Sequence, residues 1–321
     1  MFGFLLSLPD LILVLLGFIC LIWGGESVVQ GAIALARKMN VSPLLIGFTI
    51  VAVGTSLPEL AVTIKAVSSN SQELVDLAVG GVLGSNVANV MLVLGTAAML
   101  GACSEPEMGI KKDAIAVILA SIILLITVML GEISTLIGAM MLISLILYYI
   151  FSYNYSKKLG LDEELEETWI GDNIPLAIIV TIFGGILIFM GAELLIEGAI
   201  GIADEMGISE TIVGLSVIAL GTSLPELAVT VIAAFRGHKG VAIGNILGSN
   251  VINILGILGI SSVYAGGIRI SEEFAGRDIW VVMVTSGLVA VMLLNNRRIG
   301  KRVGLVMVIG YLLYMAFLYS S

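Results

Sequence analysis

Two glutamates inside hydrophobic segments are the residues of this sequence best suited to chemistry. Glu59 and Glu226 each end the same motif, Gly-Thr-Ser-Leu-Pro-Glu, at residues 54–59 and 221–226. A carboxylate within a bilayer costs several kcal/mol unless it is paired or hydrated, and no Lys or Arg lies deep enough in these segments to pair with either acid. Together the two acids supply two negative charges, which match one Ca²⁺, two Na⁺ or two protons.

Each motif also predicts a break in its helix, because Pro58 and Pro225 lack an N–H and clash with the preceding turn. Such breaks should leave carbonyls without helical partners near Ala52, Thr55, Ala219 and Thr222. In lipid, free carbonyls are tolerated only where they are buried in protein or line a wet cavity. Carbonyl, hydroxyl and carboxylate oxygens together are the ligands that a hard cation prefers.

A second duplicated motif, Gly-Ser-Asn-x-x-Asn, can add neutral oxygens to this set. It supplies Ser85, Asn86 and Asn89 in one copy, and Ser249, Asn250 and Asn253 in the other. The outer two residues of each copy are four apart, the spacing that places side chains on one helical face. An alternative is that Pro and Gly only kink packed helices while Ser, Thr and Asn link neighbours. Two near-identical copies, each with a membrane glutamate, favour the ion site.

The elements that carry these residues are predicted to be membrane helices. The chain has 321 residues, of which 59% are hydrophobic and 12% charged, with a mean hydropathy of +1.12. Soluble domains contain about 25% charged residues. The net charge of −9 argues against nucleic-acid binding. The N-terminal residues lack a basic stretch, so no cleaved signal peptide is expected.

The sequence repeats itself. Residues 31–63 and 198–230 are identical at 18 of 33 aligned positions, and residues 80–95 and 244–259 at 9 of 16. The halves are predicted at 1–152, with motifs 54–59 and 84–89, and at 174–321, with motifs 221–226 and 248–253. An acidic linker, 153–173, should join them.

Each half is predicted to cross the membrane five times, giving an all-α protein of ten transmembrane helices. The expected spans are 8–36, 42–68, 73–100, 113–130 and 133–152, then 174–203, 208–235, 240–263, 278–295 and 302–319. An odd number of spans per half inverts the second half. With the termini outside and the acidic linker in the cytoplasm, the inside connections hold 12 Lys or Arg and the outside ones 3. Inverted repeats with centrally broken helices are a common transporter plan.

The doubled motifs, in this order, resemble the alpha repeats of the calcium/cation antiporter superfamily, most closely prokaryotic sodium/calcium exchangers. The resemblance implies a multi-pass cell-membrane protein with a central diamond of ion sites and alternating access by sliding of the first and sixth helices. It implies Ca²⁺ and Na⁺ as transported ions, no cofactor and no enzymatic activity. The ligands carried over are Glu59, Glu226, Thr55, Ser56, Thr222, Ser223, Ser85, Asn89 and Ser249, with the carbonyls of Ala52 and Ala219.

The last ligand position departs from the family pattern. Sodium/calcium exchangers often carry Asp where this chain has Asn253. One fewer ionisable group leaves H⁺ or K⁺ as alternative coupling ions. A passive cation channel is a further alternative, although two full carboxylates suit tight binding better than rapid release. An intramembrane enzyme is disfavoured, because no Ser–Lys, His–metal or paired-aspartate pattern is present.

Overall fold

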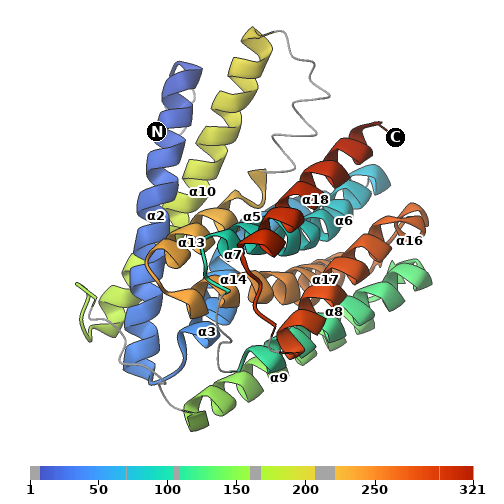
Figure 1. The fold of residues 1–321 in the computed structure, drawn as a ribbon. Coiled ribbons are helices and arrows are strands. Elements are labelled where there is room, and N and C mark those ends of the chain that lie inside the picture. Colours follow the sequence, from blue (N-terminus) through green and yellow to red (C-terminus); the bar gives the residue numbers. More distant parts are fainter. Residues whose placement is uncertain are drawn as a thin grey trace.

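A computed structural model describes residues 8–69, 71–103, 109–159, 168–206, 221–295 and 297–320. The described chain is helical apart from one two-residue strand pair (Figure 1). The first half contains α2 (Asp10–Met39), α3 (Pro43–Ile46), η1 (Gly47–Val51), α4 (Ala52–Thr55), α5 (Leu57–Val67), α6 (Gln72–Ala88), η2 (Asn89–Val93), α7 (Leu94–Met99), α8 (Ile110–Leu130), β1 (Glu132–Ile133) and α9 (Thr135–Leu159). The second contains α10 (Ile174–Glu205), α13 (Leu224–Phe235), α14 (Lys239–Val251), η4 (Ile252–Leu258), α15 (Gly259–Ala265), β2 (Ile268–Arg269), α16 (Glu273–Gly276), α17 (Asp278–Leu294) and α18 (Lys301–Ser320). The η elements are π-helical.

Seven of the described helices, counting α6 through α7 and α14 through α15 as continuous, are long and apolar enough to cross a membrane. The bent pair Pro43–Thr55 and Leu57–Val67 makes an eighth candidate span. Two shorter apolar helices, Leu224–Phe235 and Asp278–Leu294, fall below the length of a span within the described residues. The chain is therefore a multi-pass, all-helical membrane protein. Of the expected span 208–235, residues 208–220 lie outside the described residues and the last twelve form α13.

The two longest helices, α2 and α10, pack side by side along one flank of the molecule (Figure 1). They meet at glycines: a Cβ on Gly17 would lie 2.8 Å from the carbonyl oxygen of Gly191, and one on Gly24 would lie 2.7 Å from that of Gly184. The paired positions run in opposite directions along the two helices, so the pair is antiparallel. We call this contact the glycine seam. It brings the two backbones closer together than any side chain would allow.

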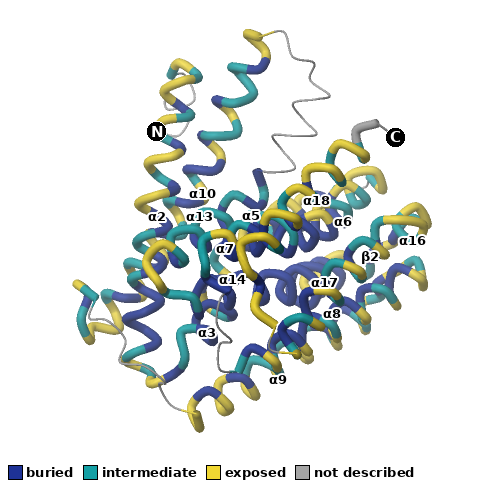
Figure 2. Tube along the Cα trace, viewed as in Figure 1, coloured by how far each residue is buried: buried dark blue, intermediate teal, exposed yellow. Residues whose placement is uncertain are grey.

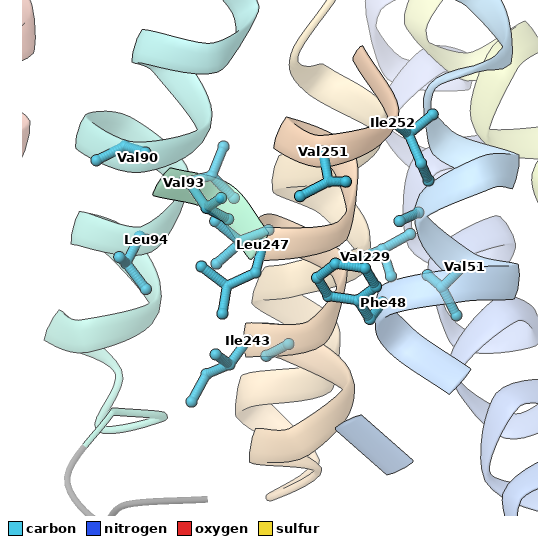
Figure 3. Packing of buried hydrophobic residues seen from close by; sticks show 14 of the residues in the cluster. Phe48, Val51, Val90, Val93, Leu94, Val229, Ile243, Leu247, Val251 and Ile252 are labelled. Atoms are coloured by element: carbon cyan, nitrogen blue, oxygen red, sulfur yellow. The ribbon is translucent and has the colours of Figure 1, made fainter. Parts of the chain in front are cut away.

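The centre of the remaining helices is α14, which is buried along its length from Gly240 onward (Figure 2). Gly244 and Gly248 sit directly against the backbones of Leu44 and Phe48, so α14 of the second half contacts α3 and η1 of the first. Aliphatic side chains from both halves fill the space around it (Figure 3). Any polar side chain on α14 is therefore held in a fully packed environment.

Two expected boundaries are corrected at α9. Ile133 was expected to begin a helix, but it pairs with Ile268 in the β1–β2 ladder, and Ser134 accepts a hydrogen bond from the Ile137 amide before α9 starts. This two-residue strand pair is a local feature of an otherwise all-helical fold. The linker was expected from residue 153, but α9 continues to Leu159. The buried Ser156 side chain donates to Ser42, which holds this last stretch against the core. Linker residues 160–167 lie outside the described residues.

Candidate cation-binding site

The two Gly-Thr-Ser-Leu-Pro-Glu motifs break their helices in the same way. In the first half α4 ends at Thr55, Ser56 takes φ −90° and ψ 6°, and the chain resumes as α5 with a bend of 45°. In the second half Ser223 takes φ −92° and ψ 0° before α13 begins. Each proline is the second residue of its new helix, where a missing N–H costs nothing. The predicted breaks at Pro58 and Pro225 are confirmed.

Each break places its glutamate in the first turn of a new helix, Glu59 in α5 and Glu226 in α13. Unpaired amide groups give a helix N-terminus partial positive charge, which favours a carboxylate there. Both side chains are buried, with 5% of Glu59 and 0% of Glu226 exposed. The two carboxylates are close enough to repel each other electrostatically. The structure thus brings together the two acids that the sequence singled out.

Neither carboxylate is neutralised by a basic side chain among the described residues. Both oxygens of Glu59 and Oε2 of Glu226 are buried without a hydrogen-bond partner. Oε1 of Glu226 accepts a hydrogen bond of 3.2 Å from Ser56, which belongs to the opposite half. Buried unpaired acids are costly, so a cation or protons must accompany this pair.

Hydroxyl groups surround the acids. Thr55, Ser56 and Ser249 lie next to the Glu226 carboxylate, and Ser85 lies next to that of Glu59. The Thr55 and Ser249 oxygens are 3.4 Å apart. Ser223 Oγ is buried without a partner, and Thr222 is partly exposed. These oxygens come from both halves and can ligate a cation without adding charge.

One expected carbonyl is not free. The Ala52 carbonyl accepts a hydrogen bond of 3.1 Å from the Ser56 amide, because the helical pattern persists until the break. The Thr55 hydroxyl oxygen also lies 3.3 Å from this carbonyl. The expectation that Ala52 lacks a helical partner is therefore wrong. The carbonyl that loses its donor is that of Gly54, four residues before Pro58. Ala219, the matching residue of the second half, lies outside the described residues.

The Gly-Ser-Asn-x-x-Asn motifs meet across the two halves. Asn253 donates a hydrogen bond of 3.2 Å to Ser85 Oγ, so the end of one motif contacts the start of the other. Both amide atoms of Asn89 and the Oδ1 atom of Asn253 are buried without partners. Asn89 begins η2 and Asn253 is the second residue of η4. Single wide π-type turns of this kind are frequent at functional sites.

Known proteins resemble the chain over nearly its full length. Residues 10–154 and 176–320 each match the family described as sodium/calcium exchanger protein. The chain belongs to this family. CaxA of Alkalimonas amylolytica is 35% identical over 97% of this chain and 98% of its own length. The structure of the sodium/calcium exchanger from Methanococcus jannaschii superposes with a TM-score of 0.81 at 28% identity, over 96% of this chain and 97% of that one.

The solved structures that match also include the sodium-calcium exchanger NCX_Mj soaked with 10 mM Na⁺ and 10 mM Sr²⁺. It has a TM-score of 0.78 and 29% identity, covering 96% of this chain and 97% of that one. The chain is therefore a cation-exchanger family transporter, with two family repeats, and not an enzyme. The resemblance expected from the duplicated motifs is confirmed.

Three buried asparagines near the candidate site were not among the ligands predicted from the sequence. Asn245 on α14 is fully buried and hydrogen-bonded to both halves. Asn86 and Asn250 are buried with all their amide atoms unpartnered. For Asn245 a signal existed, because it precedes Ser249 by four residues and so continues the face that carries Ser249 and Asn253. Asn86 and Asn250 were visible as part of their motif.

A cavity lies between the glycine-seam helices and the two breaks. Its lining includes Val28 of α2, Gly185 of α10, and Gly54, Thr55, Pro58 and Pro225 at the breaks. The buried Thr55 thus borders this cavity on the side where α2 and α10 pack. No cluster of three or more His, Cys, Asp or Glu occurs in the part of the chain that the structure describes. Two carboxylates with neutral oxygens suit hard cations such as Ca²⁺ and Na⁺ better than zinc or copper.

Proposed function

We propose that the chain is a secondary active antiporter that exchanges Ca²⁺ for Na⁺ by alternating access at this site. The observation that carries the proposal is the pair Glu59 and Glu226, one from each half, buried together with no basic partner among the described residues. Their two charges balance either one Ca²⁺ or two Na⁺. Competition of the two ions for the same acids is what exchange requires.

The proposed ligands are Glu59, Glu226, Thr55, Ser56, Thr222, Ser223, Ser85, Asn89, Ser249 and Asn253, with backbone oxygens at the breaks. The family supports Na⁺ and Ca²⁺ as the ions, because the Methanococcus jannaschii relative is a sodium/calcium exchanger. Oxygens from both halves enclose the acids, so a sliding of α2 and α10 past the helices that carry these oxygens can change which side of the membrane reaches them.

The proposed membrane arrangement has ten helices, both termini outside and the acidic linker inside. It adds Asp278–Leu294 and a span ending in α13 to the eight candidates. The excess of Lys and Arg in the connections assigned to the cytoplasm supports this orientation. The glycine seam supports movement of α2 and α10 as a pair past the packed core, because it holds these two helices together backbone to backbone.

Transport by the purified protein in liposomes tests the proposal. Liposomes loaded with Na⁺ and diluted into Na⁺-free buffer should take up ⁴⁵Ca²⁺, and liposomes without the Na⁺ gradient should not. Glu59→Gln and Glu226→Gln should each abolish uptake, whereas Glu193→Gln, an exposed acid on α10, should retain it. Uptake by either site variant at the wild-type rate would refute the site.

A second candidate uses H⁺ or K⁺ as the coupling ion, and it is favoured by one observation. The position that is often Asp in these exchangers is Asn253, so the described site contains two carboxylates rather than three. Uptake driven equally by a proton or K⁺ gradient in Na⁺-free liposomes would favour this candidate over Na⁺ coupling. Unitary currents in a planar bilayer would instead indicate a channel.

A further inference from the structure

Asn245 lies at the junction of the two halves and carries three hydrogen bonds. Its Oδ1 accepts from Thr55 Oγ1 at 3.1 Å, and its Nδ2 donates to the Glu226 carbonyl at 3.3 Å and to Thr230 Oγ1 at 3.1 Å. We propose that Asn245 is a positioning residue that holds the Thr55 hydroxyl with its lone pairs toward the cation. This inference rests on the proposed function, because it assigns a role within the same ion site.

The orientation of the Asn245 amide follows from its partners. A backbone carbonyl can only accept a hydrogen bond, so the atom facing the Glu226 carbonyl must be the NH₂ group. The opposite side of the amide, facing Thr55, must then be the oxygen. The choice between the two flipped forms is thus set by chemistry. Thr230 accepts from the same NH₂ group and supports the same orientation.

The amide in turn sets the direction of the Thr55 proton. An amide oxygen cannot donate, and a hydroxyl has one proton, so Thr55 gives that proton to Asn245 at 3.1 Å rather than to the more distant Ala52 carbonyl at 3.3 Å. With this proton directed to Asn245, the lone pairs of Thr55 Oγ1 are free for a cation bound between it and the neighbouring Glu226 carboxylate. Ser249 Oγ lies 3.4 Å from the same oxygen. The oxygen is therefore preset as a ligand and need not reorient when a cation enters.

The matching position of the first half does not repeat this arrangement. In the alignment of residues 80–95 with 244–259, Asn245 corresponds to Gly81, which has no side chain and is exposed. A side chain added at Gly81 would meet no atom within 4 Å of its Cβ. Thr222, the counterpart of Thr55, therefore receives no matching amide from position 81. The two threonines are consequently unequal, and Thr55 should contribute more to cation affinity than Thr222.

A double-mutant cycle separates positioning from general packing. The apparent KM for Ca²⁺ is measured in liposomes for wild type, Asn245→Ala, Thr55→Val and the double variant. Each single change should raise KM by about ten-fold, a coupling of the usual size for residues in contact, and the double variant should be no worse than Thr55→Val alone. The maximal rate should change less than KM. Independent, multiplying effects would overturn the proposal.

Thr230→Val is the matched control. It removes another partner of the same amide while the Glu226 carbonyl still fixes the amide orientation, so KM should stay within about two-fold of wild type. An increase as large as that of Asn245→Ala would mean that Asn245 acts as a structural link, and the proposal would fail. If Asn245→Ala does not fold, Asn245→Leu fills a similar volume without an amide and takes its place in the cycle.

Calorimetry of Ca²⁺ binding to the same four variants, purified in detergent, separates a failure of the positioning role of Asn245 from a failure of the proposed exchange function. A wild-type protein that binds Ca²⁺ without exchanging it for Na⁺ contradicts the proposed function, yet its binding constants still report the coupling between Asn245 and Thr55. Binding that is equal for wild type and Asn245→Ala contradicts the positioning role, whatever the transport assay gives.

Discussion

Ser56 of the first half donates a hydrogen bond of 3.2 Å to the Glu226 carboxylate of the second, whereas the Oγ of Ser223, its counterpart in the duplicated motif, is buried without a partner. The two breaks have the same backbone form but not the same contacts. In this conformation the serine of the first motif hydrogen-bonds to the glutamate of the second, but the serine of the second motif makes no such bond to Glu59.

Ser56→Ala should therefore weaken Ca²⁺ binding more than Ser223→Ala. A hydrogen bond to a charged group contributes about 1.5–3 kcal/mol, so the apparent KM for Ca²⁺ should rise by about ten-fold or more in Ser56→Ala. Ca²⁺ uptake into liposomes at several Ca²⁺ concentrations is the measurement. A greater loss in Ser223→Ala would show that this hydrogen bond does not set the affinity.

The glycine seam yields a prediction with adjacent residues as variant and control. A Cβ on Gly184 would lie 2.7 Å from the Gly24 carbonyl oxygen, whereas one on Gly185 would meet nothing within 4 Å. Gly184→Ala should force α2 and α10 apart and lower the exchange rate, while Ca²⁺ binding by the core residues should persist. Gly185→Ala should leave both nearly unchanged. Equal exchange rates for the two variants would mean that close packing of this pair does not matter for transport.

Much of this arrangement could be predicted from sequence where the cause is local. A proline's missing N–H acts within one turn, so the breaks before Glu59 and Glu226 were predictable, and the duplication indicated that both would share one form. The same reasoning failed at Ala52, because it did not fix the residue at which the helix ends. The helix persists through Thr55, and the Ser56 amide still reaches the Ala52 carbonyl.

Contacts between distant residues could not be predicted. Thr55 and Asn245 are separated by 190 positions, and only the packing of α14 against η1 brings them together. The pairing of Gly24 with Gly184 likewise depends on the antiparallel register of α2 and α10, which no single-sequence pattern supplies. The spacing of Asn245 and Ser249 did indicate a shared helical face, but not which partner that face would meet.

A buried charge cluster outside the ion site predicts a stability effect. Lys112 lies 2.6 Å from the fully buried Asp113 and donates to Ser152 at 2.6 Å, and Tyr148 also donates to Asp113. Asp113→Asn should destabilise the protein by about 3–5 kcal/mol, because it leaves the Lys112 charge without its counter-ion. Unfolding in detergent, by heat or denaturant, measures the change.

The second half supplies the control for this cluster. Arg277, Asp278 and Tyr314 repeat the basic–Asp–Tyr arrangement, with Arg277 3.2 Å and Tyr314 3.5 Å from Asp278. Here the basic and acidic side chains are 46% and 23% exposed, so Asp278→Asn should cost less than about 1 kcal/mol. A similar loss of stability in both variants would rule out burial as the reason for the difference.

Asn253 offers the sharpest test of how charge sets the coupling ion. Its Nδ2 donates a hydrogen bond to Ser85, which lies next to the Glu59 carboxylate, and its Oδ1 is buried without a partner. Asn253→Asp adds a third carboxylate, and Ser85 must reverse to donate to it, because an ionised carboxylate only accepts. Balancing the added charge requires a further cation. Ca²⁺ release from loaded liposomes should therefore depend more steeply on external Na⁺ in the variant than in wild type.

Asn250→Asp is the matched control for Asn253→Asp, since Asn250 is an equally buried amide of the same motif that is not among the proposed ligands. It should destabilise the protein or slow exchange without steepening the Na⁺ dependence. If both variants steepen it alike, the effect belongs to negative charge anywhere in the core. If neither does, the number of carboxylates at the site does not determine how many Na⁺ ions accompany exchange, and the coupling must be set by the neutral oxygens contributed by both halves.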